Sequence, residues 1–226
     1  MFGRIAPRYD LMNTLMTFGQ DARWRRIVAQ AVPRVGPGAH VLDVGAGTGR
    51  LAEAVQADDP SRRVVGVDFA LEMLRQADDA VQMAAGDAQR LPFADARFDA
   101  VVSGFLVRNL SDTERGLREQ VRVLRPGGTL AILETTPGPP GWLRPGYRLY
   151  FRRVVPLLGR LIAGDASAYT YLPESTLAFV EPSRLVAMLE SCGLHEVRTR
   201  GLMFGTVALT VGYKPVGDQP VGYEPL

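Results

Sequence analysis

Two short apolar segments that each lead into an acid constrain the fold of this chain more than any other feature of its sequence. Residues 41–49 read VLDVGAGTG, so an apolar segment containing Asp43 runs into three glycines at alternate positions. Residues 64–68 read VVGVD, so a second apolar segment ends in Asp68. Short apolar runs of this kind are typical of buried strands in a parallel sheet. The pattern predicts an α/β fold with a ligand site at the carboxyl edge of that sheet.

The glycine turn indicates which ligand this site takes. Glycine tolerates positive φ and has no Cβ, so the backbone can pass close to a ligand as it turns into a helix whose first N–H groups are unpaired. Dinucleotide folds use G-x-G-x-x-G, whereas here Gly45 and Gly47 begin G-x-G-x-G, and Arg50 replaces the last glycine. Asp43 is placed to meet the ammonium of a methionine moiety, and Asp68 to accept from both ribose hydroxyls. These features favour S-adenosylmethionine over NAD and predict a methyltransferase. The structural alternatives are a plain tight turn and a helix N-cap at Asp68.

The composition is that of an ordinary globular domain. The chain has 226 residues, 46% of them hydrophobic, and a formal net charge of +2. This length suits one domain, and the charge gives no reason to expect a nucleic-acid partner. A single cysteine, Cys192, excludes an internal disulfide framework, and the two histidines are far apart, so no metal site is expected. Because neither a signal peptide nor a membrane-spanning run is present in the sequence, we expect a cytoplasmic protein.

Strand and helix patterns alternate along the rest of the chain, which predicts a parallel sheet with helices on both faces. SDTE at residue 111 has the spacing of a capping box that opens a helix ending at 124, and RPGG at 125–128 predicts a turn. A late helix is expected over 181–192. Further strands are expected at 81–85, 98–103 and 129–134, with a closing antiparallel pair at 194–200 and 206–213.

We expect one domain over residues 1–215. Its N-terminal part, residues 1–35, reads as a helical segment, and residues 137–180 read as a helical insertion between the last parallel strand and the closing pair. Residues 216–226 repeat the pattern VGYxP of residues 211–215, and we expect a flexible tail there.

Residues after the third and fourth strands extend the site, because ligands of such sheets bind at the carboxyl ends of the strands. Asp87, in the sequence Gly86-Asp87-Ala88, can accept from the adenine amine while apolar neighbours cover the ring. A turn residue is the structural alternative for Asp87. Ser103 ends the fourth strand and would lie beneath the reactive end of the cofactor.

These motifs together resemble class I S-adenosylmethionine-dependent methyltransferases. Four other motifs narrow the resemblance to the quinone-biosynthesis C-methyltransferases of the UbiE/MenG family: IAPRYDLMN at 5–13, FLVRN at 105–109, GDASAYTYL at 164–172 and GTVAL at 205–209. The resemblance implies a Rossmann-like seven-stranded sheet of order 3-2-1-4-5-7-6 with strand 7 antiparallel. It implies methylation of a ring carbon on a reduced polyprenyl quinone precursor, with demethylmenaquinol as the leading substrate. It implies cofactor contacts at Thr48, Asp68, Asp87, Ala88 and Ser103.

The chain departs from the pattern of this family at four positions. Leu106 and Val107 replace the more common Gly-Ile or Gly-Leu, Thr210 stands where relatives often carry His, and Phe204 stands where a smaller residue is usual. Because these differences concern the pocket, the resemblance leaves the head group of the quinone and the length of its tail open.

The implied reaction needs a base and groups that favour a phenolate. A quinol ring carbon becomes nucleophilic when the neighbouring hydroxyl loses its proton, and the ring must lose a proton after methyl transfer. We expect Arg108 and Asn109 to hold the quinol oxygens, with Arg108 stabilising the anion, and Tyr9 to cover the ring or hydrogen-bond to it. Deprotonation would pass through water or to Asp165, because arginine stays protonated in proteins. A surface ion pair for Arg108 and core packing for Tyr9 are the alternatives.

Residues 142–162 combine aromatic and basic side chains with no acid, the composition of an interfacial helix. A polyprenyl substrate resides in the bilayer, so we expect this segment to dock transiently on anionic lipid at the inner face of the cell membrane. A lid packed on the core and a homodimer contact are the alternatives.

Other functions remain open on the sequence. The same reaction could act on the ubiquinone precursor or on another lipid or phenol. A nicotinamide-dependent oxidoreductase is disfavoured by Asp43 and by the missing glycine. A non-catalytic cofactor-binding module is disfavoured by the presence of Arg108, Asn109 and Asp165.

Overall fold

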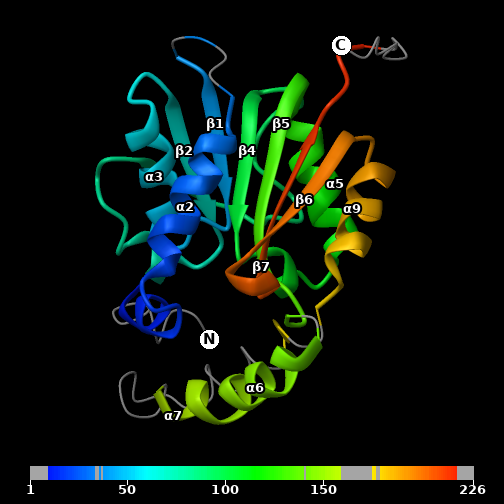
Figure 1. Cartoon of the computed structure of the whole chain (residues 1–226). Helices are drawn as coiled ribbons and strands as arrows, with labels where there is room; N and C mark the ends of the chain where they lie inside the picture. Colours follow the sequence, from blue (N-terminus) through cyan, green and yellow to red (C-terminus); the bar gives the residue numbers. More distant parts are fainter. Residues whose placement is uncertain are drawn as a thin grey trace.

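Seven strands form one mixed sheet with the order β3-β2-β1-β4-β5-β7-β6 (Figure 1). The computed structural model describes residues 10–33, 36, 38–139, 141–158, 175–176 and 179–217. Pairing is parallel from β3 to β5, and β7 is antiparallel to both β5 and β6. The predicted strand order and the antiparallel strand are therefore confirmed. The strands are β1 His40–Val44, β2 Arg63–Asp68, β3 Gln82–Ala85, β4 Phe98–Gly104, β5 Leu124–Thr135, β6 His195–Leu202 and β7 Val207–Tyr213.

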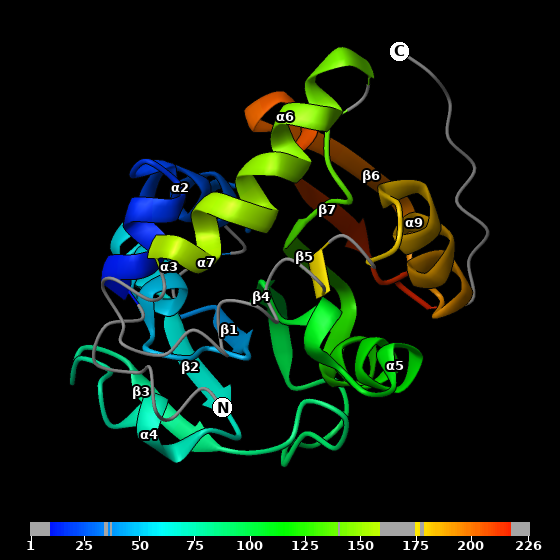
Figure 2. The same ribbon diagram turned by 90° about the horizontal axis from the view of Figure 1, so that it is seen from below.

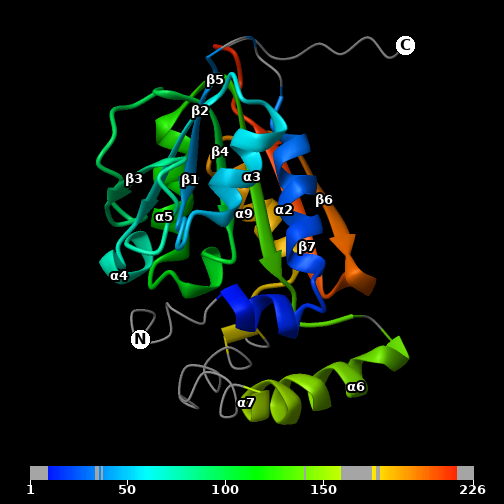
Figure 3. The same ribbon diagram turned by 90° about the vertical axis from the view of Figure 1, so that its left-hand side faces the viewer.

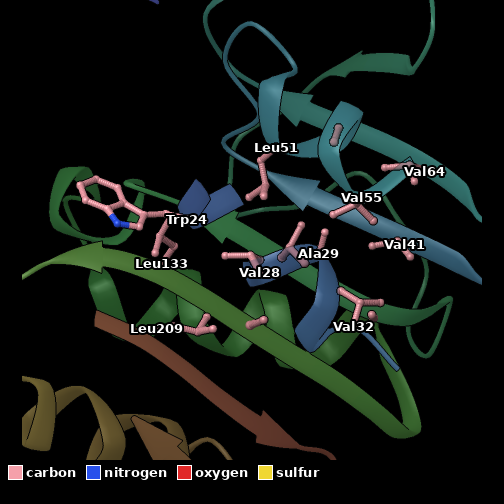
Figure 4. Packing of buried hydrophobic residues seen from close by; sticks show 14 of the residues in the cluster. Trp24, Val28, Ala29, Val32, Val41, Leu51, Val55, Val64, Leu133 and Leu209 are labelled. Atoms are coloured by element: carbon pink, nitrogen blue, oxygen red, sulfur yellow. The ribbon is translucent and has the colours of Figure 1, made fainter. Parts of the chain in front are cut away.

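Helices cover both faces of the sheet, with α2 and α3 on one side and α5 and α9 on the other (Figure 2). Strand β1 contacts both layers, because successive side chains of a strand point to opposite faces: Val41 packs in the α2 and α3 core, and Leu42 in the α5 and α9 core. Figure 4 shows the first of these cores around Val28 and Val55. The helices are α2 Gln20–Ala31, α3 Arg50–Asp58, α4 Leu71–Leu74, α5 Thr113–Val123 and α9 Pro182–Ser191.

Helix α5 begins one residue later than the capping-box pattern suggests. The Oγ of Ser111, the expected cap, donates to Gln89 Oε1 at 3.0 Å. Asp112 caps the helix instead, by accepting from the backbone N of Arg115 at 3.0 Å. The long side chain of Gln89 thus competes for Ser111 and moves the cap by one position.

The turn predicted at 125–128 is a bulge within a longer strand. Pairing between β4 and β5 passes from the pair Phe98–Leu124 to the pair Ala100–Thr129, so the four residues between Leu124 and Thr129 lie opposite a single residue of β4. The backbone of Gly127 turns there with φ of +78°.

Two helical segments lie beyond the carboxyl edge of the sheet (Figures 1 and 3). Residues 10–16 are helical and precede α2. After β5, a helical run passes from η2 Gly141–Leu143 through α6 Arg144–Leu149 and η3 Tyr150–Val154 to α7 Val155–Leu158. Tyr150 joins the two segments, because its hydroxyl donates to the carbonyl of Met16 at 2.9 Å.

Within the described ranges, none of the helices is both long enough and apolar enough to cross a bilayer. The same part of the chain holds no group of three or more His, Cys, Asp or Glu side chains arranged to bind a metal ion.

Candidate active site

The turn after β1 is shaped by its three glycines. Gly45, Gly47 and Gly49 have φ of +72°, +57° and +84°, a region in which a residue with a Cβ is strained. A Cβ on Gly45 would also come within 2.7 Å of the Leu106 side chain. Leu106, which departs from the family pattern, therefore packs directly against this turn and narrows the space beside it.

Asp68 fixes the turn from the end of β2. One carboxylate oxygen accepts from the backbone N of Gly47 at 2.9 Å, and the other accepts from the N of Ala70 at 2.8 Å. The side chain is half-buried. A carboxylate has about four lone-pair sites, so both oxygens retain the capacity to accept from the hydroxyls of a ribose.

Asp43 is buried beneath the turn with one oxygen unpaired. Its side chain belongs to a residue that is 1% exposed, and its Oδ2 accepts from the backbone N of Ala52 in the first turn of α3 at 3.0 Å. Its Oδ1 has no hydrogen-bond partner. Burial, together with the negative charge of Asp68, raises the pKa of Asp43 to about 7. A buried oxygen in this state costs free energy unless a donor reaches it, so the site is suited to a cationic group.

Asp10 contacts the residues of the glycine turn through two side-chain hydrogen bonds. It lies in the helical residues 10–16, and its two carboxylate oxygens accept from Thr48 Oγ1 at 2.9 Å and from Arg50 Nε at 3.0 Å. Thr48 is buried, and the contact with Asp10 raises the pKa of Arg50. The N-terminal segment therefore contributes directly to the site around the glycines.

The residues predicted after β3 and β4 have different surroundings. Asp87 is exposed, and its Oδ1 accepts from the backbone N of Gln89 at 2.8 Å, which is the turn role considered as its alternative. Ala88 packs against the α5 and α9 core. Ser103 is fully buried, and its Oγ has no hydrogen-bond partner. The linings of the two cavities described next include none of the three, so their cofactor roles stay predictions.

Two adjoining cavities open above the carboxyl edge of the sheet. The smaller, of about 50 Å³, lies over the glycine turn and is lined by Asp43, Thr48 and their neighbours. The larger, of about 330 Å³, lies among α2, the loop after β4, the helical insertion and the start of β7. Asn13, Arg25 and Phe105 line both cavities. Two adjacent cavities have room for two ligands side by side, which is the geometry that transfer of a group between them requires.

Phe105 forms the wall between the two cavities, and its backbone is strained. Its φ is +58°, and its N–H donates to the carbonyl of Leu133 at 2.8 Å. Its own carbonyl accepts from Arg108 Nη1 and from Asn109 Nδ2, both at 2.9 Å. Strained backbone of this kind persists only where the surroundings enforce it, commonly at functional sites.

Arg108 lines the larger cavity and is paired with a buried acid. It follows Phe105 in η1 Val107–Asn109, and its Nη1 forms an ion pair with Glu134 Oε1 at the end of β5. Its backbone N also donates to Glu134 Oε2, at 3.2 Å. The Arg108 side chain is 7% exposed and that of Glu134 is 2% exposed, and Arg108 Nε has no hydrogen-bond partner. The surface ion pair considered for Arg108 is therefore wrong, because Glu134 holds the guanidinium in the interior.

Glu134 was not among the predicted site residues, although a signal for it exists. Like Asp68, it is an acid that follows a run of apolar residues at the carboxyl end of a parallel strand.

The predicted residue Asn109 does not line the larger cavity; its amide donates to the carbonyl of Phe105. Tyr9 and Asp165 lie outside the described residues, so their predicted roles stay predictions.

Comparison with known proteins decides the class. Residues 1–214 match the ubiE/COQ5 methyltransferase family. The chain belongs to this family. It is 46% identical over 221 residues to the demethylmenaquinone methyltransferase of Deinococcus radiodurans, covering 95% of this chain and 91% of the relative. It is 46% identical over 222 residues to the enzyme of that name from Thermus thermophilus, covering 95% of this chain and 100% of the relative.

A third relative, the ubiquinone/menaquinone biosynthesis C-methyltransferase UbiE of Desulfotalea psychrophila, is 42% identical over 219 residues, covering 95% of this chain and 89% of the relative. Solved structures share the fold of this methyltransferase at lower identity. A SAM-dependent methyltransferase of Thermotoga maritima has a TM-score of 0.64 at 20% identity, covering 95% of this chain and 100% of that one. A SAM-dependent methyltransferase of Aquifex aeolicus has a TM-score of 0.56 at 20% identity, covering 79% of this chain and 84% of that one. The predicted Rossmann-like class I fold is thus confirmed.

The residues around the glycine turn fit S-adenosylmethionine, the methyl donor. The unpaired Oδ1 of Asp43 suits the ammonium group of its methionine part, and Asp68 suits its ribose. The open backbone at Gly45 and Gly47 lets the ligand approach closely. Arg25, which lines the smaller cavity, suits the methionine carboxylate. The turn after β1 therefore fits this cofactor, whereas Asp68 at the end of β2 lines neither cavity, so the contacts of both acids with the cofactor stay predictions.

Proposed function

We propose that this methyltransferase transfers a methyl group from S-adenosylmethionine to a ring carbon of a reduced polyprenyl quinone precursor, demethylmenaquinol. The observation that carries the proposal is the larger cavity, which adjoins the cofactor cavity and is walled by the aromatic side chains of Trp24, Phe105, Tyr147 and Tyr150. Flat apolar walls suit an aromatic bicyclic ring with an apolar tail. The names of the relatives from Deinococcus and Thermus support this choice of substrate.

The protein's contribution to the reaction is orientation and charge. S-adenosylmethionine supplies an electrophilic methyl group. The walls formed by Phe105 and Trp24, whose ring centroids lie 6.2 Å apart, hold the acceptor ring beside the cofactor cavity and exclude water. Such positioning contributes about 7–11 kcal/mol in favourable cases. Arg108, held by Glu134, faces the same cavity and stabilises a phenolate oxygen.

The remaining sequence-based assignments belong to this proposal. Arg108 contacts a quinol oxygen. Asn109, which the sequence pattern assigns to the quinol oxygens as well, does not line the cavity and contributes instead through the carbonyl of Phe105 that both side chains hold. Tyr9, which lies outside the described residues, is assigned by the sequence pattern to cover the acceptor ring or to hydrogen-bond to it. Asp165 or a water molecule is the base that the sequence pattern offers.

The test is methylation of defined quinols by the purified protein. Isotopically labelled S-adenosylmethionine is incubated with demethylated naphthoquinols and benzoquinols of several tail lengths under reducing conditions, and the labelled product is identified by mass spectrometry. We expect a C-methylated naphthoquinol. Label on oxygen, or no transfer to any quinol by a sample that binds S-adenosylhomocysteine, would contradict the proposal.

A benzoquinol acceptor is the second candidate. The name of the relative from Desulfotalea psychrophila couples ubiquinone and menaquinone biosynthesis, so one site in this family can serve two head groups. Equal turnover of both quinol classes in the same panel would favour this reading. Membership in a methyltransferase family removes the reason to consider a nicotinamide-dependent oxidoreductase.

We also propose that the helical insertion docks on anionic membranes. Trp142 is 86% exposed and Leu149 is 62% exposed, and Arg148, Arg152 and Arg153 are exposed beside them. Exposed apolar side chains interleaved with arginines suit a bilayer interface. Phe18 and Met203, which line the larger cavity, are also exposed, so an apolar rim borders the opening for a lipid substrate.

A further inference from the structure

A buried carboxylate outside the predicted site lines the acceptor cavity. Asp21 lies in the first turn of α2 and is 3% exposed. Its carboxylate accepts from Thr17 Oγ1 at 3.2 Å and from Thr14 Oγ1 at 3.4 Å, and it forms an ion pair with Arg25 Nη1 at 3.0 Å. Among the described residues that line this cavity, Asp21 is the one carboxylic acid.

Arg25 places this carboxylate at the junction of the two cavities. It stands four residues after Asp21 on the same face of α2, so the pair meets across one helical turn. Arg25 lines the cofactor cavity as well as the acceptor cavity, whereas Asp21 lines only the acceptor cavity. The acid therefore faces the acceptor from the side of the cofactor, where the reacting carbon must lie.

The other described groups of this cavity are poorly suited to accept a proton. Arg108 offers only N–H donors and no acceptor, and its partner Glu134 does not line the cavity. Burial raises the pKa of Tyr147 and of Tyr150, so both phenols stay protonated. The hydroxyl groups of Thr17, Thr135 and Thr206, which also line the cavity, are far too weak as bases. Asp21 is the remaining candidate on the described part of the chain.

We propose that Asp21 is the general base of the methyl transfer and that Arg25 is its positioning residue; this inference rests on the proposed function. The hydroxyl next to the reacting carbon gives its proton to a carboxylate oxygen of Asp21, and the electron pair left on oxygen moves into the ring. The ring carbon then forms its bond to the methyl group as the sulfur–methyl bond breaks and S-adenosylhomocysteine remains. The methylated ring releases its C–H proton to solvent and recovers aromaticity, and Asp21 returns the proton it holds to the oxygen, so one proton is released overall.

The electrostatic surroundings favour this step. The phenolate forms in a largely apolar cavity between two arginines, Arg25 on α2 and Arg108 on η1, and charges in such places interact more strongly than in water. A positioned general base accelerates a reaction by about 10²–10⁴-fold. Arg25 forms an ion pair with Asp21, and the charge of Asp21 also helps to raise the pKa of Arg50, which binds Asp10. Arg108, Tyr147 and Tyr150 line the same cavity as Asp21.

The test compares wild type, Asp21→Asn and Asp21→Glu on a series of demethylated quinols of increasing acidity. For the least acidic quinol we expect turnover of Asp21→Asn to fall by about 10²–10⁴-fold, while its calorimetric affinity for S-adenosylhomocysteine is kept. The deficit should shrink as the quinol becomes more acidic or the pH rises, because the phenolate then forms without help. Asp21→Glu keeps a carboxylate, so its turnover should depend on quinol acidity only weakly, as we expect for the wild type.

Two results would overturn the inference. One is a loss of turnover in Asp21→Asn that is the same for every quinol and at every pH, as a structural defect would give. An equal loss of turnover in Asp21→Glu would count in the same way. The other is an acidity-dependent deficit in Asp165→Asn with none in Asp21→Asn. Methylation by the wild type on the same panel reports on the proposed function itself, so a failure of Asp21 as base is distinguishable from a wrong substrate.

Discussion

At the scale of single residues, the site depends on two acids that differ in burial and in partners. Asp68 has both oxygens in backbone hydrogen bonds, whereas Asp43 has one oxygen paired and one unpaired. The two side chains lie near the carboxyl ends of neighbouring strands, but Asp43 is buried and Asp68 is half-buried. Burial raises the pKa of Asp43. An ionised Asp43 lacks a second donor until a ligand brings one.

The raised pKa of Asp43 gives a prediction about pH. Because its folded-state pKa is about 7, well above that of an unfolded chain, the folded protein binds a proton between those two values. Stability in the absence of ligand should therefore fall as pH rises from about 4 to about 7. Urea denaturation across this range checks the slope, which Asp43→Asn should reduce.

Ligand binding should show the opposite trend. An ammonium group prefers the ionised form of Asp43, so affinity for S-adenosylhomocysteine should fall as pH drops below about 7, with proton release on binding. Calorimetry in buffers of different ionisation enthalpy measures that release. Equal affinity at pH 6 and pH 8 in wild type, or an unaltered profile in Asp43→Asn, would contradict the role of Asp43.

At the scale of elements, the loop after β4 is attached to β5 by one buried ion pair. Arg108 in η1 and Glu134 in β5 form this pair, and the carbonyl of Phe105 is held by the same guanidinium. The pair therefore holds Phe105 in the wall between the cavities, and it fixes the position of the positive charge of Arg108 at the acceptor cavity.

Glu134→Gln should destabilise the protein by about 3–5 kcal/mol, because it leaves Arg108 as a buried cation without its counter-charge. Glu114→Gln is the matched control, since Glu114 pairs with Arg118 on the surface of α5 and such pairs contribute about 0–1 kcal/mol. Urea denaturation measures both free energies of unfolding. Similar losses in the two variants would show that burial of the Arg108 pair does not matter.

Arg108→Ala tests the chemical role of the same pair. Turnover should be mostly lost, while affinity for S-adenosylhomocysteine should be kept, because Arg108 lines the acceptor cavity and not the cofactor cavity. Labelled methyl transfer and calorimetry measure the two quantities. Unchanged turnover would remove Arg108 from the mechanism.

The helical insertion gives a prediction about membranes. Arg152→Glu with Arg153→Glu should weaken binding to vesicles that contain anionic lipid by roughly 30-fold or more, because each arginine near the surface contributes about 1 kcal/mol. Arg118→Glu with Arg198→Glu changes the net charge equally, but on α5 and β6, and should have little effect. Sedimentation with anionic and neutral vesicles at two salt concentrations measures binding. Equal losses in the two double variants would point to net charge alone.

At the scale of the whole molecule, both cavities depend on segments that are distant in the sequence. The cofactor cavity joins the helical residues 10–16 to the turn after β1, and the acceptor cavity adds α6, η3 and the start of β7. Neither cavity would exist in an isolated strand–turn–helix unit. We infer that residues 1–215 act as one domain, as the sequence suggests.

A single domain predicts one cooperative calorimetric transition, with equal calorimetric and van't Hoff enthalpies. Saturation with S-adenosylhomocysteine at about 100 times its dissociation constant should add about 2.7 kcal/mol to the stability of the folded state. For a chain of this size the midpoint should rise by roughly 5–10 °C. Two separate transitions, with only one shifted by ligand, would show that the insertion unfolds independently.

The sequence by itself determined the family and the glycine turn, and the resemblance to that family implied the strand order. The turn follows from local patterns: three glycines at alternate positions after one apolar run, and a second apolar run that ends in Asp68. The family match extends over almost the whole chain. Such patterns can be recognised in the sequence because each involves residues that are adjacent in the chain. The cap at Asp112 was missed because Gln89, a residue from another loop, binds Ser111.

Only the tertiary structure decided which groups meet in the acceptor cavity. Asp21 carries no signal in the sequence, and its place in the cavity comes from burial beside Arg25. Glu134 ends an apolar run, as Asp68 does, but only the structure pairs it with Arg108, which lines the cavity. Burial depends on how elements pack against one another. Removal of water and the approach of a specific cation change the proton affinity of a carboxylate. For that reason the site for the acceptor could be seen only after the helices had been placed over the edge of the sheet.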